Sequence, residues 1–221
     1  EPSNTAHFSV LTSGFTAVTN RFVIDTLLHT KKLLDEGKIQ MTNYEDFFEV
    51  GYRLKTDKDV YHFLTNVASE NGAARSRGLC HRVVRALCIV WEIKDREHLR
   101  ETINEVISIL KNSYDGEKNP PKIQTLKGMI REFEEELVWA HFGVQVKNVH
   151  HLRLGFYTGD IFTEQPDKTR DVNPIVDLLQ QVKPTKLSLT LDPEGSGPDT
   201  HYKVLQATAA AVKRWSELED T

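Results

Sequence analysis

The sequence has no long apolar run, no excess of positive charge and no secretion signal. No stretch approaches the roughly 20 consecutive apolar residues that cross a bilayer as a helix. The formal net charge of −4 gives no basic field that would attract nucleic acid. The first residues show no charged segment followed by an apolar one. We therefore expect a cytoplasmic protein with neither a nucleic-acid nor a membrane partner.

Cysteine is also scarce, and the two cysteines are expected to be free. If residues 78–93 form one helix, Cys80 and Cys88 are about 12 Å apart along its axis, which is too far for a disulfide. We interpret both as buried thiols in a reducing compartment. The alternative is a redox-active pair.

What remains is an ordinary globular chain that is rich in helical patterns. It has 221 residues, 39% of them hydrophobic and 27% charged, which suits one large domain or two small ones. Segments with apolar residues at helical spacing are 18–36, 59–70, 78–93, 96–111, 122–142 and about 200–218. Pro120 and Pro121 precede the segment 122–142 and Gly143 follows it, as expected at the two ends of a helix. Residues 78–93 are apolar nearly all round, which predicts a central buried helix.

Short β-branched runs bounded by turn residues predict strands at 7–12, 149–156 and 186–191. Helices alternate with these runs at the ends of the chain, which predicts parallel pairing. Residues from about 30 to 120 look like an all-helical insertion. We therefore expect an α/β fold that is helix-rich overall. Because parallel sheets normally have more strands, some strands are either unrecognised or absent from this chain.

The loop after the third predicted strand carries the richest set of candidate site residues. Asp192, Glu194, Asp199 and His201 would lie at the carboxyl end of that strand, where open α/β folds bind ligands. The first turn of the following helix would add free amide donors, and a neutral His there could bind a divalent metal. We therefore expect Asp199 to contact substrate. The alternative is an ordinary Asp-Pro turn, with Asp199 as a helix cap.

Further candidates also have structural alternatives. Thr12, Ser13 and Gly14 would lie at the same sheet edge, although they could form a plain turn. The adjacent residues His150 and His151 point to opposite faces of a strand, so we expect one packed and one exposed histidine.

Arg131 is flanked by Glu132, Glu134, Glu135 and Glu136 on the helix 122–142. A solvated charged face is the expected interpretation of this run. Arg131 could reach a ligand only if its end of the helix faces the site.

Particular segments resemble a known family. VHHLRLGFYTGDIFTE, VKPTKLSLTLDPEGSGPDTHYKVLQA and the TSG at 12–14 are similar to the PIG-L/LmbE-like deacetylase domain. More narrowly, they resemble the version fused behind a glucosamine-6-phosphate deaminase domain in certain bacterial proteins. The match is close over 143–212 and looser over 5–20 and 120–142.

The resemblance implies a Rossmann-like parallel sheet sandwiched by helices, spanning 1–221 as a single domain with the helical insertion. It implies an amino-sugar hydrolase of carbohydrate metabolism, which removes an acetyl group with zinc. By position, His201 matches a metal-ligating and catalytic histidine, and Asp192 matches an acidic residue that orients the site. Thr12, Ser13 and Gly14 match a pocket-lining loop. Arg131 lies near a substrate-binding arginine of the family.

One departure from the family concerns the metal. The family's His-Pro-Asp-Asp motif, which supplies two metal ligands and the general base, is absent from the sequence. We therefore expect a hydrolase only in a longer protein, with zinc bound weakly or not at all by this chain. The alternatives are a degenerate domain that binds an amino sugar or its phosphate, and an interaction module whose helical block contacts a neighbouring domain. Self-association is a further expectation, because a sheet without its first strand would expose an edge.

Overall fold

A computed structural model describes residues 5–114, 116–160, 164–189 and 199–219, and the chain divides into two compact units. The helical unit spans Gly14–Val149. The strand unit comprises the described residues of Glu1–Ser13 and His150–Thr221. Each unit is described by itself below. The expected single family domain stays a prediction.

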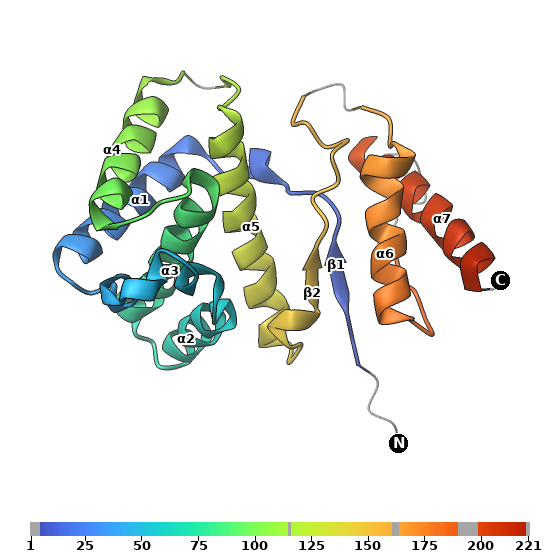
Figure 1. Ribbon diagram of the computed structural model, residues 1–221, viewed down its shortest axis with the longest axis horizontal. Helices are drawn as coiled ribbons and strands as arrows, with labels where there is room; N and C mark the ends of the chain where they lie inside the picture. Colours follow the sequence, from blue (N-terminus) through green and yellow to red (C-terminus); the bar gives the residue numbers. More distant parts are fainter. Residues whose placement is uncertain (1–4, 115, 161–163, 190–198, 220–221) are drawn as a thin grey trace. The chain divides into compact units, whose positions relative to one another are not determined.

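The helical unit is built from the elements labelled α1 to α5 in Figure 1. Short 3₁₀ turns connect α1 to α2. The helices are α1 (Asn20–Asp35), α2 (Thr56–Ala68), α3 (Gly72–Trp91), α4 (Arg96–Asn112) and α5 (Pro121–His141). These bounds confirm the helices expected from the apolar periodicity, with ends that shift by a few residues.

Local signals explain where several helices begin and end. The Thr19 hydroxyl accepts a hydrogen bond of 3.1 Å from the amide of Phe22 at the start of α1. Asp95 accepts one of 2.8 Å from the amide of His98 at the start of α4. Such caps satisfy amide donors that have no partner within the helix. After α5, Gly143 has a left-handed backbone, with φ of 86°. The expected stop at this glycine is confirmed.

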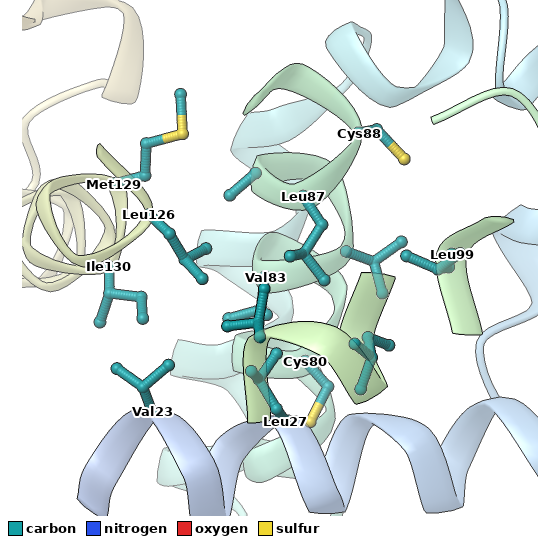
Figure 2. Close-up of a cluster of buried hydrophobic side chains, with 14 of the residues drawn as sticks. Val23, Leu27, Cys80, Val83, Leu87, Cys88, Leu99, Leu126, Met129 and Ile130 are labelled. Carbon is teal, nitrogen blue, oxygen red and sulfur yellow. The ribbon is translucent and has the colours of Figure 1, made fainter. Parts of the chain in front are cut away.

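The core of the helical unit surrounds α3, as Figure 2 shows. The α3 side chains Val83 and Leu87 are almost fully buried. They meet side chains of α1, α4 and α5, including Val23, Leu27, Leu99, Leu126 and Ile130. Burying one such side chain contributes about 1.5–3 kcal/mol. Cys80 and Cys88 lie in the same core as free thiols, which confirms that both are buried and unbridged.

The strand unit contains a short sheet and two helices. Strand β1 (Phe8–Val10) pairs with β2 (Val149–His151), and β2 begins at the last residue of the helical unit. The amide of Leu152 donates to the Val10 carbonyl at 3.0 Å, just beyond the end of β2. Helix α6 (Asn173–Val182), preceded by a π-helical turn, packs against α7 (Asp199–Glu219). Their core includes Leu154, Phe156, Ile175, Val176, Leu179 and Ala211.

The prediction of a Rossmann-like sandwich is wrong. Of the residues that the structure describes, 69% are helical, and they contain one parallel sheet of only two short strands. The expected strand at 186–191 is not formed over residues 186–189, and residues 190–191 lie outside the described part. Leu187 and Leu189 are 47% and 43% exposed. A run of alternating apolar residues becomes a strand only when a neighbouring strand pairs with it, and none is described here.

None of the described helices is long and apolar enough to span a membrane, as expected from the sequence.

Candidate functional site

The structure brings two of the predicted site residues together within the helical unit. Gly14 has a left-handed backbone, with φ of 61°, and precedes the 3₁₀ turn Phe15–Ala17. A Cβ atom placed on Gly14 would lie 3.8 Å from Nε of Arg131 on α5. Glycine adopts this conformation without strain, and the guanidinium lies beside the position that a side chain would occupy. Gly14 and Arg131 were predicted separately as substrate-binding residues, and they are neighbours.

Arg131 forms ion pairs with carboxylates one turn further along α5. Nη1 of Arg131 contacts Oε2 of Glu134, and Nη2 lies 3.6 Å from Oε1 of Glu135. These i,i+3 and i,i+4 spacings place the three side chains on one helix face. About one third of the Arg131 side chain is exposed, and so are comparable fractions of the two glutamates. The Arg131 cluster, defined as Gly14, Arg131, Glu134 and Glu135, therefore offers both cationic donors and anionic acceptors to solvent.

The expectation of a solvated charged face on α5 is only partly met. Glu134 and Glu135 are partly exposed, whereas Glu132 and Glu136 are buried. Arg82 on α3 donates from Nη2 to Oε2 of Glu136 at 2.5 Å. Packing against a second helix, which the single-helix pattern cannot report, explains the burial.

The other predicted site residues belong to the strand unit. Thr12 and Ser13 follow β1, as expected, and are half-buried. Asp199 and His201 lie on the first turn of α7, where His201 is exposed. Asp199 accepts from Nζ of Lys203 at 2.6 Å. Asp192 and Glu194 lie outside the described residues. The roles assigned to all these residues stay predictions.

His7, just before β1, and His150 on β2 form an unexpected contact. Nδ1 of His7 and Nε2 of His150 are 3.0 Å apart, and their ring planes differ by 7°. The ring centroids are 5.3 Å apart, so the rings meet edge to edge at these nitrogens rather than face to face. Burial lowers the pKa of His150, and His7 and His151 act in the same direction. The expected split into one packed and one exposed histidine is wrong, because His150 and His151 are both half-buried.

A buried ionic cluster between α2 and α3 was not predicted from the sequence. Arg85 donates from Nε to Asp59 at 2.7 Å, and from Nη1 to the carbonyls of Gly51, Tyr52 and Leu54 at 3.0, 3.2 and 2.8 Å. Burial raises the pKa of Asp59, while the guanidinium of Arg85 acts in the opposite direction. The available signal was an arginine within an otherwise apolar run, since such a residue needs a buried partner.

No group of three or more metal-ligating side chains occurs among the residues that the structure describes. The assignment of zinc to His201 therefore stays a prediction.

Comparison with known proteins gives one distant relative. Over 117 residues the chain is 30% identical to a glucosamine-6-phosphate deaminase-like protein of Bacteroides thetaiotaomicron. The match covers 52% of this chain and 17% of the relative, so the chain spans a small part of that protein. No family model and no solved structure matches the chain. The chain is distantly related to part of that protein, and membership of the deacetylase family stays a prediction.

Proposed function

We propose that this chain binds an amino sugar, or its phosphate, as part of a longer protein of amino-sugar metabolism. The relationship to the deaminase-like protein supports the substrate class. The proximity of Arg131 to Gly14 carries the proposal for the binding site, because a partly exposed guanidinium lies beside a residue that has no side chain.

The chemistry of the Arg131 cluster suits such a ligand. A guanidinium offers several N–H donors in a fixed plane, which bind hydroxyl, carboxylate or phosphate oxygens. The carboxylates of Glu134 and Glu135 accept hydrogen bonds from a protonated amine. An amino sugar carries hydroxyls and an ammonium group on adjacent carbons. A ligand with both groups can replace part of the Arg131–glutamate contacts with contacts of its own.

Calorimetric titration of the full chain tests this proposal. We expect glucosamine 6-phosphate to bind more tightly than glucose 6-phosphate, which lacks the amine that the glutamates would hold. Glu134→Gln together with Glu135→Gln should remove this preference. Arg131→Gln should weaken binding of glucosamine 6-phosphate by about tenfold or more, the size of one lost charge-assisted hydrogen bond.

The matched control is Arg21→Gln. Arg21 forms a comparable i,i+4 pair with Asp25 at 2.8 Å, on an exposed face of α1. This variant should bind like the unmodified chain. Equal binding of the two sugar phosphates, or equal effects of Arg21→Gln and Arg131→Gln, would refute the proposal.

A further inference from the structure

Nitrogen atoms on one face of α3 are buried without hydrogen-bond partners. Nε of Arg77 and Nε2 of His81 have none within the described part of the chain. The residues are four positions apart, so they lie one turn apart on the same side of the helix. Buried polar atoms without partners are rare in folded proteins, and an ordered water or bound ion commonly accounts for them. Finding such atoms on neighbouring turns points to a shared ligand.

A second histidine lies beside them on α2. The rings of His62 and His81 are nearly parallel, 9° apart, with centroids separated by 6.3 Å. A close approach of the two helices allows this arrangement. At Gly78 a Cβ atom would be 3.3 Å from the Asp59 carbonyl oxygen and 3.1 Å from Cβ of Phe63. The glycine thus brings α2 and α3 together next to the histidine pair.

The surroundings of His81 are positively charged. Burial, together with the charges of His62, Arg85 and Arg77, lowers the pKa of His81 to about 4. The nearest carboxylate is Asp59, whose Oδ1 is 3.9 Å from Nδ1 of His81. Arg85 already holds that carboxylate at 2.7 Å. Nε2 points in a different direction from Nδ1 and makes no hydrogen bond to Asp59.

We propose that Arg77 and His81, with His62 beside them, bind a phosphate-type oxyanion. The oxyanion would accept hydrogen bonds from Nε–H of Arg77 and Nε2–H of His81, which would satisfy both buried atoms. Its charge would complement the local excess of cations. Nε2 of His81 is itself buried, although 21% of the His81 side chain is exposed, so an anion reaches Nε2 only when the surrounding side chains move aside. This site shares no residue with the Arg131 cluster.

Nuclear magnetic resonance of the histidine rings in the full chain tests the proposal. Inorganic phosphate, added at constant ionic strength set with chloride, should give a saturable shift of the His81 ring nitrogens. It should also raise the pKa of His81, because a bound anion favours the imidazolium form. Glucose 6-phosphate as a second ligand decides whether free phosphate or a phosphate ester is preferred. A His81 signal that responds to neither ligand would overturn the site.

Variants locate the binding residues. Arg77→Gln should weaken phosphate binding by about tenfold or more, because a buried hydrogen bond to a charged group is lost. Arg75→Gln is the matched control, since Arg75 is exposed on the same helix. His62→Gln, at an exposed position, keeps the test usable if Arg77→Gln does not fold, and it should also weaken binding. Equal binding by the Arg75, Arg77 and His62 variants would overturn the assignment.

Discussion

Arg85 and Asp59 form an ion pair of 2.7 Å between α3 and α2, with side chains only 8% and 4% exposed. The two partners differ in how many other groups they bind. Asp59 accepts a hydrogen bond from the guanidinium, whereas Arg85 also donates to the carbonyls of Gly51 and Tyr52 in the turn Gly51–Arg53 and to that of Leu54. Arg85 therefore holds the segment between α1 and α2 against α3 through hydrogen bonds.

Because the two partners differ in this way, substitutions of Arg85 and of Asp59 should lower the free energy of unfolding by different amounts. Arg85→Met removes the 2.7 Å partner of the buried Asp59 carboxylate, which keeps only longer contacts of 3.9 Å to Arg82 and His81. It also removes a donor from several carbonyls, and should lower the free energy of unfolding by about 3–5 kcal/mol. Asp59→Asn should cost less, because Arg85 keeps its carbonyl partners. Urea denaturation measures both. Arg100→Met is the control, since Arg100 pairs with Asp35 at 3.1 Å on the surface and should cost under about 1 kcal/mol. A larger loss for Asp59→Asn than for Arg85→Met would contradict this account.

The close approach of Gly155 and Arg170 in the strand unit predicts that substitutions at these two positions will not have additive effects on stability. A Cβ atom on Gly155 would lie 2.4 Å from Cδ of Arg170, which is too close for the side chain to stay in place. Arg170 holds the fully buried Asp171 at 2.9 Å, and Asp171 accepts from the amide of Phe156 at 3.1 Å. Gly155→Ala should therefore displace Arg170 and destabilise the unit by about 1–3 kcal/mol.

A double-mutant cycle checks the cause of that loss. Once Arg170→Ala has removed the obstructing side chain, adding Gly155→Ala should cost little more. Unfolding by urea, followed through circular dichroism, gives the four free energies. Additive losses would show that Gly155 acts through something other than Arg170.

The contact between His7 and His150 predicts a pH dependence of strand pairing. Only one proton fits between Nδ1 and Nε2 at 3.0 Å, so the contact is lost when both rings are protonated. Since folding lowers the pKa of His150, the stabilisation is complete above the ordinary histidine pKa of about 6.5 and is lost as the pH falls through the lowered pKa.

Hydrogen exchange at Leu152 and Leu154 measures this effect, because their amides donate to Val10 and Leu11. Protection, corrected for intrinsic exchange, should fall below about pH 6 in the unmodified chain and less steeply in His150→Gln. His141→Gln serves as the control, since His141 is an exposed histidine of the helical unit. Identical pH profiles for the His150 and His141 variants would rule out the histidine contact as the cause.

Cys88 should be inert toward alkylating reagents in the folded chain. Burial raises its pKa to about 12, so almost no reactive thiolate exists at neutral pH. Labelling by iodoacetamide, followed by mass spectrometry, should proceed at the rate of unfolding and accelerate in Arg85→Met. Labelling of the folded chain as fast as a small free thiol would show that the core around α3 is open.

The amino-acid sequence by itself determined the helices. Their signals are local: apolar residues repeat every three or four positions, and caps such as Thr19 and Asp95 lie next to the amides they bind. The prediction that Cys80 and Cys88 form no disulfide also follows from their spacing along one helix. The structure confirms both as buried free thiols.

Only the tertiary structure decided the sheet and the polar contacts, because each depends on residues far apart in the chain. Leu187 and Leu189 have the pattern of a strand, yet no described neighbour pairs with them. Arg85 is buried because α2 brings Asp59 to it. The approach of Gly14 to Arg131 depends on how the turn Phe15–Ala17 packs against α5. Periodicity reports which face of an element is apolar, but it does not report which other element will cover that face.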